Sequence, residues 1–182
     1  MVYTRASGHV ARAHTRLSIM MDGLAIRRCT RDELGNVMSI NERTLPENYP
    51  QFFYESIIER FPESFLVAED TNSNQLVGYV MFRVERNLES GLKFIKKAHL
   101  VSIAVLKEYQ GNKIGEKLLL EAMRCVNNYG IDMFVLEVRI SNAIAISMYK
   151  KLKFIVEKTI SEYYRDGEDA YYMVLKASDF KR

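Results

Sequence analysis

The sequence predicts a mixed α/β domain, in which a central twisted sheet of about seven strands is flanked by about four helices. From Leu24 onward, short runs of β-branched and aromatic residues alternate with longer segments whose apolar residues recur at helical spacing. The 182 residues, 48% of them hydrophobic and 27% charged, match one globular domain with a substantial core. We therefore expect a single domain over residues 21–182.

Residues 1–20 differ from the rest in charge. They contain Arg5, Arg12 and Arg16 without any acidic residue, and these account for the whole net charge of +3. Because the remaining chain is neutral, no general surface for DNA or another polyanion is expected. The segment lacks the apolar stretch of a secretory signal, although its Arg-rich, acid-free character overlaps that of organellar transit peptides. We expect a basic, disordered extension.

The first predicted elements are a strand at residues 24–29 and a helix that follows it directly. Thr30 and Glu33 form the capping-box pattern that opens a helix, and Leu34, Val37, Met38 and Asn41 then share one side. Two prolines interrupt residues 45–50, after which a helical pattern resumes over residues 51–60. Together these segments predict a strand and two helices joined by a structured loop.

The middle of the chain predicts three strands. Residues 64–69 and 76–85 flank a polar turn at residues 71–74 and so form an antiparallel hairpin. Residues 86–97 are charged and are expected to form a loop before the next strand at residues 98–105. If that strand is regular, alternate residues share a face. One face then holds His99, Val101, Ile103 and Val105, and the other holds Leu100, Ser102 and Ala104.

Residues 109–115, Tyr-Gln-Gly-Asn-Lys-Ile-Gly, lie between this strand and an amphipathic helix that starts at Ile114. A glycine-bearing turn that opens a helix offers unpaired backbone N–H groups and the positive end of the helix dipole. The segment therefore predicts a phosphate-binding loop. A strand at residues 133–139, a helix at 143–152 and two strands at 154–161 and 170–175 complete the predicted order.

No apolar run approaches the roughly 20 residues that a membrane-spanning helix needs, so we expect no membrane contact. Cys29 and Cys125 are the only cysteines, one on a predicted strand and one on the apolar side of a predicted helix. Two buried free thiols fit these positions better than a disulfide or a metal site. A reducing, cytoplasmic setting is expected.

The phosphate loop, its flanking strand and helix, and the pattern Asn142-x-x-Ala145-x-x-x-Tyr149-x-Lys151-x-x-Phe154 resemble the GCN5-related N-acetyltransferase (GNAT) superfamily. The resemblance covers nearly all of residues 24–176 and implies the GNAT fold. Residues 45–49 and 163–171 are similar, more narrowly, to the catalytic subunits of the archaeal and eukaryotic NatA type. That similarity implies acetyl-CoA as donor, protein N-termini as acceptors, and no metal requirement.

The resemblance also implies a set of cofactor-binding residues. They are Ile103, Ala104, Val105, Gln110, Gly111, Asn112, Lys113, Ile114, Gly115, Glu116, Asn142, Tyr149 and Lys151. Lys113 departs from the family, which usually has glycine there, and it adds a cation near the phosphate. Asn142 is expected to cap its helix and reach the cofactor, and the Tyr149 phenol to protonate the leaving thiolate. Without the motif, a tyrosine at this position would be read as core.

Direct transfer to an α-amine needs little base catalysis. An α-amine with a pKa near ~8 is about one-tenth neutral at pH 7, whereas the neutral fraction of a lysine amine with a pKa near ~10.4 is roughly two to three decades smaller. The neutral amine can attack the thioester without a covalent enzyme intermediate when both reactants are held in contact. A backbone N–H near Val105 is expected to stabilise the developing oxyanion.

Three residues are candidates for taking the proton from the amine, namely Glu47, His99 and Glu137. Each has a structural alternative: a solvated loop carboxylate, a hydrogen-bonded strand histidine, and a strand carboxylate with a buried partner. We favour an orienting role for Glu47 and a water-mediated relay between His99 and Glu137. Two ligands make a poor zinc site, so a metal bound to this pair is a remote alternative.

Peptide recognition is assigned to Glu47 and Tyr49 in the Pro-bounded loop and to Tyr163 and Tyr164 before the last strand. A tyrosine ring walls a pocket while its hydroxyl bonds peptide backbone. Acetylation of lysine or of a small amine is the nearest alternative function, because the same cofactor half serves it. A non-enzymatic CoA-binding or ribosome-docking module is more remote. An auxiliary subunit is a further expected partner.

Overall fold

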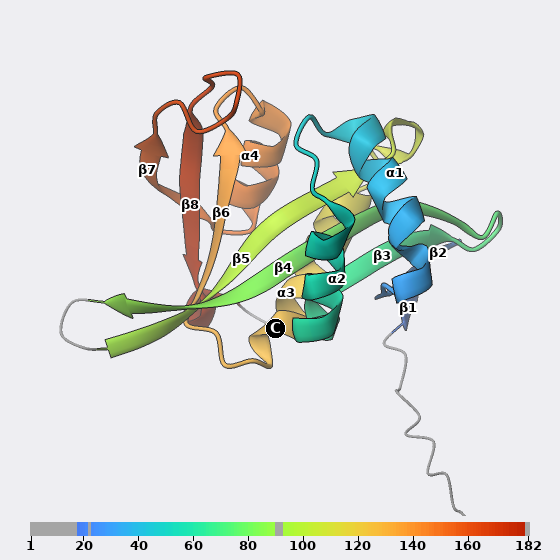
Figure 1. Cartoon of the computed structure of the whole chain (residues 1–182), viewed down its shortest axis with the longest axis horizontal. Coiled ribbons are helices and arrows are strands. Elements are labelled where there is room, and N and C mark those ends of the chain that lie inside the picture. Colours follow the sequence, from blue (N-terminus) through green and yellow to red (C-terminus); the bar gives the residue numbers. More distant parts are fainter. Residues whose placement is uncertain (1–17, 22, 90–92, 181–182) are drawn as a thin grey trace, which may run out of the picture.

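The computed structural model describes residues 18–21, 23–89 and 93–180 (Figure 1). These residues form one eight-stranded sheet in the order β1-β2-β3-β4-β5-β6-β8-β7. Its strands are β1 (Ser18–Met21), β2 (Leu24–Arg28), β3 (Phe65–Asp70), β4 (Gln75–Glu89), β5 (Lys93–Val105), β6 (Met133–Arg139), β7 (Ile155–Ile160) and β8 (Ala170–Lys176). The helices are α1 (Leu34–Thr44), α2 (Gln51–Arg60), α3 (Ile114–Asn127) and α4 (Ala143–Lys151).

All seven predicted strands and all four predicted helices are present, which confirms the mixed α/β fold class. The eighth strand, β1, pairs antiparallel with β2 and includes residues that the sequence assigned to the basic extension. The disorder expected for residues 1–20 does not extend to residues 18–20, which lie in β1, and residues 1–17 lie outside the described part of the chain. The predicted capping box of Thr30 and Glu33 is present, and it opens a 3-10 turn that leads into α1.

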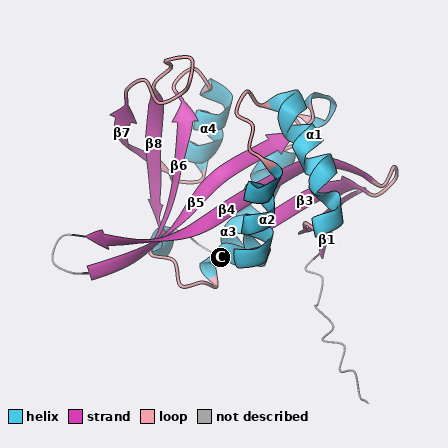
Figure 2. Ribbon diagram, viewed as in Figure 1, coloured by secondary structure: helices cyan, strands magenta, loops and turns pink. Residues whose placement is uncertain are grey.

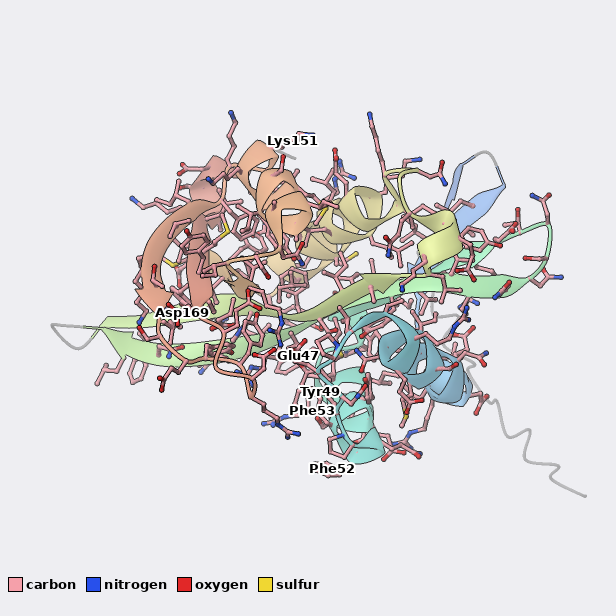
Figure 3. All side chains as sticks on the ribbon, turned by 90° about the horizontal axis from the view of Figure 1, so that it is seen from above. Glu47, Tyr49, Phe52, Phe53, Lys151 and Asp169 are labelled. Atoms are coloured by element: carbon pink, nitrogen blue, oxygen red, sulfur yellow. The ribbon has the colours of Figure 1, made fainter. Side chains whose placement is uncertain are left out.

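The helices cover both faces of the sheet. Figure 3 shows α3 and α4 above it and α1 and α2 below it. Each pair closes its own core: Leu118 and Phe134 belong to the core on the α3 side, and Val37 and Tyr54 to the core on the α1 and α2 side. Cys29 and Cys125 are buried free thiols, one in each core, as expected.

The prediction of a loop at residues 86–97 is wrong. β4 and β5 continue pairing through this segment, with Arg86 opposite Lys96 and Leu88 opposite Phe94. Figure 1 shows them extending past the rest of the sheet as a two-stranded ribbon. The charged composition was misleading because most of this ribbon is exposed: Leu88 is 57% exposed and Phe94 68%, whereas Ile95 is buried at 5%.

β5 is also not a regular strand. Met81 pairs with Ser102 and Phe82 with Leu100, so Val101 is an extra residue opposite the partner strand. Such a bulge moves the following side chains to the other face of the sheet. Leu100 therefore joins the α3 core while Ala104 joins the α1 and α2 core, and the expected common face of Leu100, Ser102 and Ala104 is not formed.

Candidate active site

The sheet opens at its centre. Among the strands that the structure describes, β5 and β6 are the only parallel pair, and they pair at three positions that end with His99 opposite Val135. Beyond His99, β5 pairs only with β4, and β6 only with β8. Figure 2 shows β5 and β6 splayed apart along part of their length. The backbone edges that face the gap are thus free to bond other groups, and functional side chains from both sides of the sheet meet around it.

The phosphate loop lies at the end of β5 on the α3 side. Among the described residues, the N–H groups of residues 111–116 form no hydrogen bond, and the first helical bond runs from Lys117 N to Lys113 O at 3.0 Å. Gly111 and Lys113 both have positive φ, +83° and 58°. A run of free N–H groups at a helix N-terminus can bind an anion of phosphate size.

Side chains hold this loop in place. Gln110 donates from Nε2 to the Val105 carbonyl at 2.9 Å, and Asn112 donates from Nδ2 to the Tyr109 carbonyl at 3.2 Å. A Cβ at Gly111 would meet no atom within 4 Å, so the glycine is needed for its backbone angle and leaves open space for a ligand. Lys113 stands where the family usually has glycine. Its backbone adopts the left-handed conformation although it carries a side chain.

α4 lies beside the loop. Asn142 caps it, since its Oδ1 accepts from Ala145 N at 3.1 Å. Met148 Sδ is 4.0 Å from where a Cβ at Gly115 would stand, so α4 adjoins the start of α3. Tyr149 is 4% exposed, and burial raises the pKa of its phenol, which therefore keeps its proton. Lys151 lines a separate, open hollow of about 600 Å³ with Ile140.

On the other side of the gap, His99 and Glu137 are in direct contact. His99 Nε2 lies 2.6 Å from Glu137 Oε2, so the expected bridging water is not needed. His99 Nδ1 lies 3.1 Å from Glu85 Oε1 and 3.2 Å from Arg83 Nη2. The imidazole is thus held between two carboxylates with a guanidinium beside it.

This setting favours the imidazolium form. Burial lowers the pKa of His99, but the hydrogen bond and charge of Glu137 and the hydrogen bond to Glu85 outweigh it, and the pKa lies above its ordinary value. Both ring nitrogens face carboxylate oxygens, as a doubly protonated ring requires. The ring must lose one of these protons before His99 can accept another.

Three tyrosines surround this pair. The Tyr49 hydroxyl donates to the carbonyl of Val101, the bulge residue, at 3.2 Å. Tyr172 is directly opposite Glu137 in the pairing of β6 with β8. Burial and the charge of Glu137 raise the pKa values of Tyr163 and Tyr172 to about 12. Neutral phenols therefore line the approach to His99.

Arg139, at the end of β6, joins the loops on either side of that approach. Its guanidinium contacts Glu47 at 2.6 Å, Asp166 at 2.8 Å and Glu168 at 2.7 Å, and it lies 3.9 Å from the centre of the Tyr164 ring. Hydrogen bonds from Ser141 and the Arg139 charge lower the pKa of Glu168 to about 2. Glu47 is therefore held in place by an ion pair, as its expected orienting role requires.

Sequence reasoning brought His99, Glu137, Tyr49 and Tyr163 into one site, and the structure places them together. It missed Arg83, Glu85, Arg139 and Tyr172. Their alternation with apolar neighbours along β4, β6 and β8 was the only available signal, and most exposed strand residues carry the same pattern. Within the described residues, no group of three or more His, Cys, Asp or Glu side chains is arranged to hold a metal ion.

Residues 34–154 match the family described as Acetyltransferase (GNAT) family, and the chain belongs to that family. Among its relatives, the N-alpha-acetyltransferase of Saccharolobus solfataricus is 41% identical over 152 residues, which is 81% of this chain and 90% of that protein. The N-terminal acetyltransferase complex ARD1 subunit homolog of Dictyostelium discoideum is 36% identical, over 84% of this chain and 72% of that protein.

Solved structures share the fold. The NatC complex bound to Gag peptide and CoA contains a chain that matches with a TM-score of 0.79 at 20% identity, over 85% of this chain and 99% of that chain. Ard1 from Thermoplasma volcanium matches with a TM-score of 0.74 at 24% identity, over 85% of this chain and 98% of that chain. No helix of the described residues is long and apolar enough to cross a membrane.

Proposed function

We propose that this chain is a protein N-terminal α-amino acetyltransferase that transfers the acetyl group of acetyl-CoA directly to the N-terminal amine of a polypeptide. The observation that carries the proposal is the divergence of β5 and β6 after His99. It separates a phosphate loop on the α3 side from a tyrosine-lined His–Glu pair on the α1 and α2 side. Donor and acceptor can therefore enter from opposite faces and meet at the gap.

The cofactor half fits acetyl-CoA. The free N–H groups of residues 111–116 suit its pyrophosphate, and Met148 of α4 lies next to Gly115 in that loop. When bound, acetyl-CoA supplies the thioester that carries the acetyl group. We assign Ile103, Ala104 and Val105 to the free edge of β5 along that arm. Lys113 adds a cation, and Lys151 remains a predicted contact at the far end of α4.

The acceptor half supplies proton transfer. Once His99 has lost its extra proton, the His99–Glu137 pair takes the proton that the attacking amine releases. A backbone N–H of β5 near Val105 bonds the carbonyl oxygen as its charge grows. The carbon–sulfur bond breaks, and the protonated Tyr149 phenol donates a hydrogen bond to the leaving thiolate. No step requires a metal.

The named relatives support an α-amine as the acceptor, since they are called N-alpha-acetyltransferase and ARD1 homolog. Solved relatives such as the NatC complex occur as complexes, so an auxiliary subunit or a ribosome contact is proposed here also. We assign the catalytic domain to residues 21–182 and its action to the cytoplasm, with polypeptide N-termini and not DNA or membranes as partners.

Lysine or small-amine acetylation is the competing function, and one experiment separates the two. Release of the CoA thiol is measured with a peptide that has a free N-terminus and no lysine, and with its N-blocked, Lys-containing twin. We expect turnover of the first peptide at a rate at least tenfold above that of the second, because its amine is far more often neutral at pH 7. The reverse preference would contradict the proposal, and no thiol release from either would favour a non-enzymatic CoA-binding module.

A further inference from the structure

A groove runs along α2 on the acceptor face of the sheet. It has a volume of about 430 Å³ and lies between one side of α2 and the middle of β4. Its lining includes Phe53, Ile57, Arg60 and Phe61 from α2 and the segment after it, and Arg83 and Glu85 from β4. We call this the α2 groove.

The inner end of the α2 groove is a wall of the candidate active site. Arg83 and Glu85 are the residues that contact His99 Nδ1, at 3.2 Å and 3.1 Å. The Phe53 ring stacks on the Tyr49 ring with centres 4.9 Å apart. Figure 3 shows Phe53 beside Tyr49 and Glu47, while Phe52 points away from the molecule. The groove is thus continuous with the place where the acceptor amine reacts.

The length of the groove suits a short piece of extended chain. Phe53 and Arg60 stand two helical turns apart, which is ~10 Å at ~1.5 Å per residue. An extended peptide advances ~3.3 Å per residue, so this distance corresponds to about three residues. A polypeptide with its amine at His99 and Glu137 would place its second residue near Phe53 and its fourth or fifth near Arg60.

Charge gives the groove a preferred occupant. Arg83 is balanced by Glu85, since Arg83 Nε lies 2.5 Å from Glu85 Oε1. Arg60 is exposed at the outer end and makes no ion pair with any residue that the structure describes. A cation at the end of a groove that also contains Phe53 and Phe61 is complementary to a carboxylate that follows an apolar side chain.

We propose that the α2 groove binds the part of the acceptor polypeptide just after its N-terminus, with an apolar second or third residue against Phe53, Ile57 and Phe61 and an acidic fourth or fifth residue at Arg60. This inference rests on the proposed function. It adds a downstream preference, set by Arg60, to the recognition of the first residue by Glu47, Tyr49 and the β7–β8 loop.

The test uses two peptides that share their first three residues and carry either Asp or Lys at positions 4 and 5. We expect kcat/KM for the Asp peptide to exceed that for the Lys peptide by about three- to tenfold at low salt, as a partly exposed ion pair allows, and the ratio to shrink at high salt. Arg60→Glu should abolish or invert the ratio. Arg124→Glu, which changes the same charge on α3 at the opposite face, should leave it unchanged.

Equal ratios in the wild type and in Arg60→Glu would overturn the groove assignment while leaving the proposed function intact. A binding measurement covers the case in which neither peptide is acetylated. N-acetylated versions of both peptides, labelled at their C-termini, are titrated with the wild type and Arg60→Glu by fluorescence polarisation. Tighter binding of the Asp version only when Arg60 is present supports the groove without any turnover, and equal binding of both versions refutes it.

Discussion

His99 is the residue whose chemistry depends most on its neighbours. It is 38 positions from Glu137 in sequence, yet the two side chains are 2.6 Å apart because β5 and β6 pair up to His99 and then separate. A second carboxylate, Glu85, faces the other ring nitrogen. The raised pKa that results favours the cationic form of the ring, so proton uptake belongs to the His99–Glu137 pair as a unit.

Glu137→Gln should shift the pH dependence of catalysis. Loss of the Glu137 charge removes the main group that raises the pKa of His99, so the ring becomes neutral at lower pH and the acidic limb of kcat/KM moves down. The rate itself should fall by about 10²-fold, the usual scale for losing a positioned base. The measurement is kcat/KM from pH 5.5 to 9 with a peptide acceptor. The α-amine of that peptide titrates near ~8 and affects the profiles of the wild type and of Glu137→Gln equally.

Glu85→Gln is the matched control for that pH profile. Glu85 contacts the other nitrogen of the His99 ring, and its loss should shift the acidic limb of kcat/KM less than the loss of Glu137 does. An acidic limb that stays in place in Glu137→Gln would show that this carboxylate does not tune the titrating group.

Lys113 tests whether the phosphate loop needs a side chain or only its backbone. Its φ of 58° costs a non-glycine residue ~1 kcal/mol, which Lys113→Gly would relieve, but the gain is offset by the ~0.5 to 1 kcal/mol of extra unfolded-chain entropy of glycine. Stability by thermal unfolding should therefore change little. The KM for acetyl-CoA should rise about two- to fivefold in both Lys113→Gly and Lys113→Ala if the ammonium group contacts phosphate.

Lys117→Ala removes a charge one helical turn further along α3 and should leave that KM unchanged. If Lys113→Gly binds acetyl-CoA as well as the wild type does, the backbone alone makes the site and the cation contributes nothing.

Arg139 is the residue through which Glu47 is positioned. Arg139→Gln would release three carboxylates at once, so the loops that carry Glu47 and Glu168 would lose their common partner. We expect the KM for the peptide to rise about tenfold or more while the KM for acetyl-CoA stays the same, because the phosphate loop lies on the other face of the sheet. Arg139→Lys keeps the charge without the planar fork and should recover only part of the loss. An equal rise in both KM values would indicate a general folding defect instead.

At the scale of elements, a buried polar chain holds α1 and α2 to the sheet beside the site. Tyr54 donates to Asn41 Oδ1 at 3.1 Å, Asn41 Nδ2 donates to the Tyr79 hydroxyl at 2.9 Å, and Tyr79 meets Ser102 Oγ at 2.7 Å. This chain ends on β5 next to the bulge at Val101, whose carbonyl accepts from Tyr49. The position of the loop that carries Tyr49 therefore depends on this buried chain, whose first member, Tyr54, packs edge-on against the Tyr49 ring at 6.0 Å.

Asn41→Ala should destabilise the fold by about 2 to 3 kcal/mol, since it leaves two buried phenols without their shared partner. Urea denaturation measures this change, and the m-value should stay constant because the same surface is exposed on unfolding. Tyr54→Phe removes one donor but leaves the Asn41–Tyr79 bond, and about 1 kcal/mol is expected for it. A loss in Asn41→Ala no larger than that in Tyr54→Phe would mean that the chain is not cooperative.

At the scale of the whole molecule, the charge of His99 also makes stability depend on pH. Its folded-state pKa is raised above the ordinary value of about 6.5, so the ion pairs contribute fully below that pH and are lost as pH rises through the folded-state value. His99→Gln should therefore cost more stability at pH 6 than at pH 9, measured by urea midpoints at both values. A cost that grows toward pH 9 would reverse the assigned direction of the pKa shift.

Much of the architecture could be predicted because it rests on local patterns. The capping box at Thr30, the prolines around Glu47 and the apolar stripe that follows Ile114 each specify a helix boundary or a buried face within a few residues. The ribbon at residues 86–97 could not be predicted in the same way. Its strands are mostly exposed and bury little beyond Ile95, so their composition resembles that of a loop, and only pairing between β4 and β5 makes them strands.

The candidate site also has one part that local sequence specifies and one part that depends on tertiary structure. The phosphate loop is a contiguous segment whose glycine and helix start are written in seven neighbouring residues, 109–115, and the sequence alone determined it, together with the order of strands and helices. The partners of His99, Glu47 and Tyr49 lie on other strands and loops. Only the tertiary structure decided them, because the bulge at Val101 and the divergence of β5 from β6 set which side chains face one another, and both arise from pairing between distant segments.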